Sequence, residues 1–230
     1  MKPGEKLKKG GVAAWPICLG YMPIGLAFGV LAQKAGLSSL QVALMSIFVF
    51  AGSSQFIAVS MLSAGASLAA IVATTFMVNL RHLLMSSSLA AILGRQNRWK
   101  LSLFAYGVTD ESFAVNYTRL SAGDWGLDRS LVVNHTANLV WLVSTVAGVY
   151  FGHLIPAHAL GIDYALTAMF ICLLIFQLKD RIAILTAIMA GLLAVVLSLF
   201  IPGNAYIVLA SMLAAGIGVI IKRRLSPDET

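Results

Sequence analysis

The chain has 230 residues, of which 59% are hydrophobic and 11% charged, and its mean hydropathy is +0.89. These values exclude a soluble domain with a polar surface and predict an all-α polytopic membrane protein. A formal charge of +7 would also suit a nucleic-acid-binding protein, but the basic residues form short clusters between apolar segments. Such clusters are typical of membrane topology signals, so we expect a lipid bilayer and no nucleic acid as partner.

A helical span takes about 20 residues, so the chain has room for about eight membrane segments and for no separate soluble domain. We predict one transmembrane domain over residues 1–230, with short tails at about 1–11 and 222–230. Cys18 and Cys172 lie in apolar stretches without a Cys or His nearby at ligand spacing. Neither a disulfide framework nor a metal or other cofactor is therefore predicted.

The first apolar segment, residues 12–32, has the composition of a bent and closely packed span. Pro16 and Pro23 allow its backbone to kink. Gly25 and Gly29 form a small-xxx-small pair, which lets another helix approach closely.

The second segment, residues 40–63, is interrupted by the run Ala51-Gly52-Ser53-Ser54-Gln55. A glycine followed by three polar residues in mid-segment is typical of a discontinuous or re-entrant helix. A half-helix that starts here would point its backbone N–H groups at an anion. The alternative is an ordinary helix with a polar packing face.

The third segment, residues 66–94, carries Asn79-Leu80-Arg81-His82 among apolar and small residues. A guanidinium in hydrocarbon is retained where it has a partner or a wet cavity, so Arg81 indicates a functional site. Thr75, Asn79, His82 and Ser86 share one helical face. The alternative for this stripe is hydrogen bonding between packed helices.

The segment at residues 101–120 contains Thr109-Asp110-Glu111 at its middle. Adjacent helical residues point about 100 degrees apart, so one partner cannot satisfy both acids. We expect one acid to face a cavity or a charge such as Arg81, and the other to cap a helix or lie near the membrane interface. A plain structural ion pair between helices is the alternative.

A polar linker at 121–130, which includes Asp124, separates this segment from a span at about 131–152. That span carries a second polar stripe at helical spacing, formed by Asn134, Asn138, Trp141 and Thr145. The stripe faces the same cavity or serves as hydrogen-bonding glue between helices. After a loop with His153 and His158, spans at about 160–178, 182–201 and 204–221 complete the chain, and the last two are apolar on all sides, as in a scaffold.

The basic residues distinguish two topologies. If all eight segments cross, the cluster Arg95, Arg98 and Lys100 lies outside, against the positive-inside rule. If segments 40–63 and 101–120 are re-entrant, 14 of the 16 basic residues lie inside, Lys179 among them, and Arg81 is buried. Both layouts place both termini in the cytoplasm, and the re-entrant layout lets the two interrupted segments meet at mid-membrane.

Five strings along the chain resemble one family, the AzlC-type large subunits of bacterial branched-chain amino acid exporters. These strings are Pro23–Gly29, Val49–Phe56, Asn79–His82 together with Ser87–Ala90, Thr109–Ala114 and Asp163–Ile171. The resemblance implies export of valine, leucine or isoleucine across the bacterial inner membrane. It also implies a small, separately encoded membrane partner, an AzlD-type subunit.

An aliphatic zwitterion needs donors for its carboxylate, an acceptor for its ammonium group and an apolar pocket. We expect Arg81 and the N–H groups near Gly52–Gln55 to bind the carboxylate, and Asp110 or Glu111 to bind the ammonium group. Phe50, Phe56 and Phe113 are expected to line the pocket. The whole predicted substrate-binding set is Gly52, Ser53, Ser54, Gln55, Asn79, Arg81, Asp110, Glu111 and Asn138.

Uphill export needs a driving ion, and His82 with Asp110 or Glu111 forms a plausible proton relay. No nucleotide-binding motif is present. The alternatives are export of another small amino acid such as methionine, or a passive channel. An intramembrane serine enzyme using Ser53 or Ser54 with His82 is the least favoured alternative, because the chain has no G-x-S-x-G elbow and no paired metal ligands. We therefore expect a transporter and not an enzyme.

Overall fold

A computed structural model of the chain describes residues 3–123, 125–152, 171, 174–175, 178, 181–201 and 205–225. The regular elements in this part are all helices, as predicted. Several predictions concern residues outside it: most of the span at 160–178, residues 163–170 of the fifth string, Asp124, His153, His158, Cys172 and Lys179. The chain divides into two compact units, Met1–Leu166 and Thr167–Thr230.

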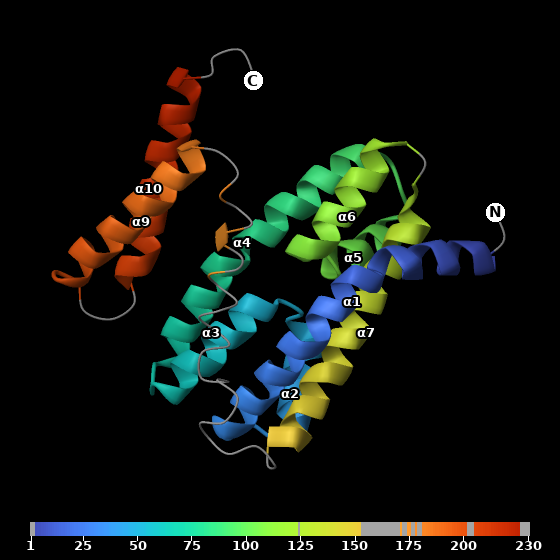
Figure 1. Cartoon of the computed structure of the whole chain (residues 1–230), viewed down its shortest axis with the longest axis horizontal. Helices are drawn as coiled ribbons and strands as arrows, with labels where there is room; N and C mark the ends of the chain where they lie inside the picture. Colours follow the sequence, from blue (N-terminus) through green and yellow to red (C-terminus); the bar gives the residue numbers. More distant parts are fainter. Residues whose placement is uncertain are drawn as a thin grey trace. The chain divides into compact units, whose positions relative to one another are not determined.

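Unit 1 contains three long helices: α1 (Pro3–Lys34), α4 (Leu68–Leu93) and α7 (Leu127–Gly152). At 1.5 Å per residue they are about 40–48 Å long, which exceeds the roughly 30 Å of a bilayer core. Together with one helix of unit 2, they are the described helices that are long and apolar enough to cross a membrane. Helix α1 begins at residue 3 and not near residue 12. The Lys-rich stretch that was expected as a tail is helical, because lysine has a high helix propensity. Figure 1 shows this N-terminal part bent away from the rest of α1.

Four short helices correspond to the two interrupted segments: α2 (Ser39–Phe48), α3 (Gly52–Ser63), α5 (Arg98–Tyr106) and α6 (Asp110–Ser121). They have 9 to 12 residues, so each reaches about 14–18 Å, roughly half of the bilayer core. The predicted discontinuities are confirmed at residues 49–51 and 107–109. In the first break, Phe50 has φ = 26°, a backbone conformation that favours glycine, and it is 3% exposed.

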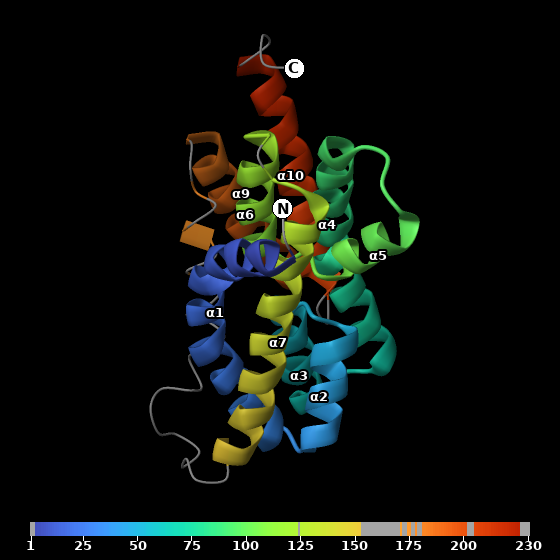
Figure 2. The same cartoon turned by 90° about the vertical axis from the view of Figure 1, so that its right-hand side faces the viewer.

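The two helix pairs occupy opposite ends of α7 (Figures 1 and 2). Helix α2 contacts the C-terminal half of α7, where Ser46 Oγ lies 2.9 Å from Thr145 Oγ1. Helices α5 and α6 contact the N-terminal half, where the Asn134 side chain donates to the carbonyl of Phe104 at 3.0 Å.

The charged residues at one end of unit 1 bear on topology. Asp128 accepts from Lys6 at 2.7 Å and from Lys100 at 2.8 Å. The N-terminal part of α1 and the start of α5 therefore lie on the same side. Eight crossing segments would separate them, so the structure favours the re-entrant layout for both interrupted segments.

Close packing of α1 on α7 forms the centre of unit 1. A Cβ on Gly29 would lie 2.0 Å from the Thr145 carbonyl oxygen, and a Cβ on Gly25 would lie 2.0 Å from Ser144 Oγ. From the other side, a Cβ on Gly148 would lie 2.2 Å from the Leu26 carbonyl oxygen. The small-xxx-small prediction for α1 is confirmed, because a side chain at these positions would force the two helices apart.

Unit 2 contains α9 (Arg181–Ser198) and α10 (Ala205–Leu225), two successive apolar helices that pack on each other. A Cβ on Gly218 of α10 would lie 2.5 Å from Thr186 Oγ1 of α9. Ala210 and Ala214 are each 1% exposed. The expected tail at 222–230 begins as helix, since α10 continues to Leu225.

Candidate functional site

The guanidinium of Arg81 connects the N-termini of α3 and α6, the two helices that follow the breaks. Its Nη1 lies 2.8 Å from Asp110 Oδ2 at the first residue of α6, and its Nη2 donates to Ser53 Oγ in the first turn of α3. Arg81 and Asp110 expose 30% and 35% of their side chains, so the ion pair is half-buried. The structure thus brings together three residues of the predicted substrate-binding set, which come from three separate segments.

The N-terminus of α3 has no side-chain cap, and its N-cap residue is Ala51. Of the backbone N–H groups of the first four residues of α3, Gly52–Gln55, that of Gln55 donates to the Ala51 carbonyl oxygen at 2.9 Å. Uncapped N–H groups and the positive end of the helix dipole both attract an anion. With the Arg81 guanidinium against Ser53, this is a position where donors for a carboxylate converge.

The N-terminus of α6 has the opposite character. Thr109 caps it in a capping box with Ser112, so two of its first N–H groups, those of Thr109 and Ser112, are satisfied by side chains of the helix itself. Asp110 and Glu111 follow in the first turn of α6, and Arg81 connects the Asp110 carboxylate to Ser53 of α3. One end of the site is therefore rich in donors and the other in acceptors.

Glu111 has a partner of its own. The Tyr21 hydroxyl of α1 lies 2.7 Å from Glu111 Oε2 and 2.8 Å from Thr109 Oγ1, and its single proton serves one of them at a time. Tyr21 is 7% exposed, and its ring makes edge contacts with Phe50 and Trp141. The second acid was expected to cap a helix or lie near the interface. The structure instead places it against the hydroxyl of a buried tyrosine.

Other polar side chains bond to carbonyl groups that the helix breaks leave free. The Tyr106 hydroxyl donates to the carbonyl of Ile47 at the end of α2, and the Asn138 side chain contacts that hydroxyl at 3.3 Å. His82 Nδ1 lies 2.7 Å from the carbonyl oxygen of Val108, so this nitrogen carries the proton of the hydrogen bond. These contacts satisfy backbone groups at membrane depth, as a broken helix requires.

A buried network holds α3 against α2 and α7. Trp141 Nε1 donates to Gln55 Oε1 at 2.9 Å, and Gln55 Nε2 donates to Ser46 Oγ at 3.3 Å. Gln55 is fully buried, and Ser54 donates to the carbonyl of Ala51 in its own turn. A Cβ on Gly52 would lie 3.2 Å from the Trp141 ring. The Gln55 and Ser54 side chains thus fix the position of the α3 N-terminus.

Three polar atoms on α4 are buried and have no hydrogen-bond partner within the described part of the chain: Asn79 Oδ1, Arg81 Nε and His82 Nε2. By contrast, Thr75, Ser87 and Ser88 bond to carbonyls of their own helix. Buried polar atoms without partners are rare in folded proteins. Asn79 Oδ1, Arg81 Nε and His82 Nε2 are therefore buried groups of α4 with hydrogen-bonding capacity left for a ligand.

The three phenylalanines expected to line a pocket are placed differently. Phe50 lies in the first break, beside Tyr21 and Tyr106. Phe56 packs on Phe28 with ring centroids 5.1 Å apart, and Phe113 packs against a hydrophobic cluster that includes Leu89, Phe104 and Leu120. Among these three, only Phe50 is next to the polar groups of the site.

The residues that sequence reasoning missed are Tyr21, Tyr106 and Ser46. One signal could have indicated Tyr21 and Tyr106, because a tyrosine hydroxyl inside an apolar segment requires a partner.

Comparison with known proteins gives a consistent result. The family described as "AzlC protein" matches residues 16–155. The "Inner membrane protein YgaZ" of Escherichia coli (strain K12) is 33% identical over 81% of this chain and 80% of its own length. The "Branched-chain amino acid transport protein AzlC" of Bacillus subtilis (strain 168) is 30% identical over 93% of this chain and 84% of its own length. An "Uncharacterized membrane protein" of Archaeoglobus fulgidus is 32% identical over 76% of this chain and 77% of its own length. No solved structure matches the chain significantly.

Proposed function

The chain belongs to the AzlC family, and from this membership we propose that it is a secondary transporter that exports valine, leucine and isoleucine from the cytoplasm. The bacterial inner membrane is its proposed location, with both termini in the cytoplasm. A small AzlD-type membrane subunit is its proposed partner. Support for the substrate comes from the name of the Bacillus subtilis relative.

The observation that carries this proposal is the position of Arg81 between the α3 N-terminus and Asp110. An amino acid carries one negative and one positive group close together. When the ion pair between Arg81 and Asp110 separates, the amino acid can therefore bind both side chains at once. In the proposed mechanism the substrate carboxylate replaces Asp110 on the guanidinium and also meets the N–H groups of α3. The substrate ammonium group then replaces the guanidinium on Asp110.

The rest of the site offers roles for the remaining predicted residues. Asn79 Oδ1 is a buried acceptor without a partner in the described part, so it supports a contact with the ammonium group. Phe50 is the buried apolar side chain of the break, and it is proposed to contact the aliphatic side chain of the substrate when the ion pair opens. Gln55 and Asn138 are proposed to act indirectly, because their side chains are bonded to Trp141 and Tyr106.

Proton coupling is proposed to use Glu111 and His82 as well as Asp110. Glu111 is supported by its hydrogen bond with the Tyr21 hydroxyl, which also lies next to the Thr109 hydroxyl, so that two hydroxyl groups are in line to pass a proton. His82 bonds through Nδ1 to the Val108 carbonyl, and Nε2 stays available for exchange. None of the hydrogen bonds found in the described residues joins His82 directly to either carboxylate, so a relay would pass through water or substrate.

The test is counterflow of labelled valine, leucine, isoleucine and methionine in proteoliposomes, with and without the small subunit. Wild-type protein and an Arg98→Gln control are expected to show saturable counterflow of the three aliphatic substrates. Arg81→Gln is expected to lose it, while remaining folded. Flux that does not saturate would identify a passive channel, and counterflow of methionine alone would replace the branched-chain assignment.

A further inference from the structure

A second polar region of unit 1 lies away from Arg81. A cavity of about 880 Å³ opens between the N-terminal part of α1, the C-terminal part of α6 and the start of α7. Four basic residues line it: Lys8 and Lys9 of α1, Arg119 of α6 and Arg129 of α7. The proposed transport mechanism uses none of them.

The cavity has a strong excess of positive charge. Among its described lining residues Glu5 is the acidic one. Its carboxylate lies 3.1 Å from Lys9 Nζ, so it offsets the charge of one of the four basic residues. Trp125 lies between the two arginines: its ring centroid is 5.6 Å from Arg119 Cζ and 4.7 Å from Arg129 Cζ. The indole ring thus holds both guanidiniums at the cavity wall.

The lining changes from basic to apolar along both helices. On α1, Lys8 and Lys9 are followed by Val12 about 5 Å beyond Lys9 along the helix axis, and by Pro16 about 10 Å beyond it. On α6 the order is reversed, and Val115 precedes Arg119 by one turn. Because α6 runs toward this end of the unit, Val115 lies on the membrane side of Arg119, and on α1 Val12 and Pro16 extend the apolar wall of the cavity beyond the two lysines.

This gradient matches one class of ligand. A phospholipid places its phosphate at the interface, where tryptophan is enriched, and its acyl chains beside apolar side chains deeper in the bilayer. A free phosphate ion would use the basic residues and leave the apolar wall without a partner. We propose that this cavity is a binding site for an anionic phospholipid, with its phosphate on the basic residues and an acyl chain along Val12, Pro16 and Val115.

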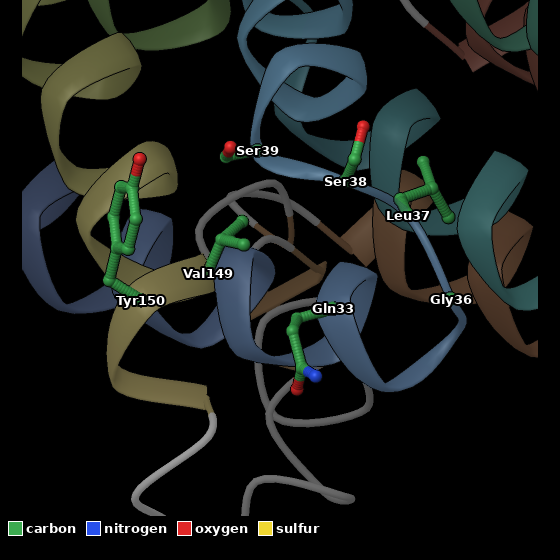
Figure 3. A pocket seen from close by; sticks show the side chains of 7 residues that line it. All are labelled: Gln33, Gly36, Leu37, Ser38, Ser39, Val149 and Tyr150. Carbon is green, nitrogen blue, oxygen red and sulfur yellow. The ribbon is translucent and has the colours of Figure 1, made fainter.

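A second pocket, at the other end of α1 and α7, shows how the charge of the lining differs between the two ends of unit 1 (Figure 3). It has a volume of about 320 Å³, and Gln33, Ser38 and Tyr150 are among its lining residues, none of which is charged. An anionic headgroup therefore has an electrostatic reason to prefer one end of unit 1.

The test is lipid retention by the purified full chain in detergent, measured by native mass spectrometry during titration with phosphatidylglycerol or phosphatidylcholine. The pocket variant is Lys8→Gln/Arg119→Gln. The matched control, Arg95→Gln/Arg98→Gln, removes the same charge outside the cavity. We expect wild type to prefer phosphatidylglycerol, the pocket variant to bind it roughly thirtyfold more weakly, and the control to change by less than about threefold. Equal binding of both lipids by wild type, or an equal loss in the control, would overturn the proposal.

A second variant keeps all the charges and tests the apolar wall. Ala114 is an exposed residue of α6 that lines the cavity, so Ala114→Trp fills space without removing a packed side chain. This variant is expected to lose phosphatidylglycerol while remaining monodisperse in gel filtration. Inorganic phosphate is expected not to displace the lipid from wild type. Displacement by phosphate, with unchanged binding in Ala114→Trp, would identify a headgroup site alone and reject the lipid assignment. Neither readout depends on transport, so the outcome is separate from that of the counterflow test.

Discussion

The ion pair between Arg81 and Asp110 allows stability and function to be separated by a double-mutant cycle. Exposed ion pairs contribute about 0–1 kcal/mol, whereas removing one partner of a buried pair costs about 3–5 kcal/mol. The two side chains are 30% and 35% exposed, so we expect an intermediate cost of about 2 kcal/mol for Arg81→Gln or Asp110→Asn. For a chain of this size, that corresponds to a decrease of about 4–8 °C in the midpoint of thermal unfolding.

The double variant Arg81→Gln/Asp110→Asn removes both charges and leaves neither one unpaired. It is expected to unfold at a higher temperature than the sum of the two single losses predicts, and it is still expected to lack counterflow, because the carboxylate site is gone. Thermal unfolding in detergent measures the first quantity, and proteoliposome counterflow measures the second. The exposed pair Glu5 and Lys9 is the control, for which the same cycle is expected to give almost no coupling. Additive losses for Arg81 and Asp110 would refute the reasoning, since they would mean that the two side chains do not interact.

Three further predictions concern packing, the second acid and topology. Gly29→Ala is expected to lower the unfolding midpoint in detergent by the equivalent of about 1–3 kcal/mol, because its Cβ would overlap a carbonyl of α7, whereas Gly20→Ala, whose Cβ has open space, is expected to leave the midpoint unchanged or raise it. Tyr21→Phe keeps the buried ring and removes the hydroxyl, so it is expected to slow counterflow at a stability cost of only about 1 kcal/mol; an unchanged rate would exclude this hydroxyl from the transport step. In a background without native cysteines, Lys8→Cys and Arg98→Cys are expected to react with an impermeant maleimide from one side of the membrane and Ser38→Cys from the other; labelling of the first two from opposite sides would contradict the re-entrant layout.

The helices and their interruptions could be predicted from the sequence because their causes are local. Twenty or more apolar residues in succession indicate a span, and Gly52 with its polar neighbours indicates that a helix restarts in mid-segment. The start of α6 also follows from local chemistry, since Thr109 is a good N-cap and two acids favour the first turn. The α1–α7 contact is partly local as well, because the spacing of Gly25 and Gly29 marks the face but not its partner.

The contacts within the site could not be predicted, because they join residues far apart in the chain. Helical geometry alone does not say which of two adjacent acids meets Arg81. In the structure each acid has a separate partner: Asp110 binds Arg81 of α4, and Glu111 binds Tyr21 of α1. The periodicity of α7 likewise marked Asn134 as polar without indicating that it bonds to a carbonyl in the last turn of α5, next to the second break. Which free carbonyl a side chain reaches depends on helix packing and not on spacing.

The two interrupted segments bear on how one site could be reached from two sides of a membrane. The α2–α3 pair enters unit 1 from one end and the α5–α6 pair from the other, and α4 packs against both α3 and α6. Arg81 lies on α4 where the two pairs meet, and its guanidinium holds Ser53 of one pair and Asp110 of the other. In the proposed mechanism, a ligand that takes the guanidinium from Asp110 frees α6 while it adds contacts at α3. We therefore propose that substrate binding determines which helix pair Arg81 holds, a coupling that alternating access requires of a single central site.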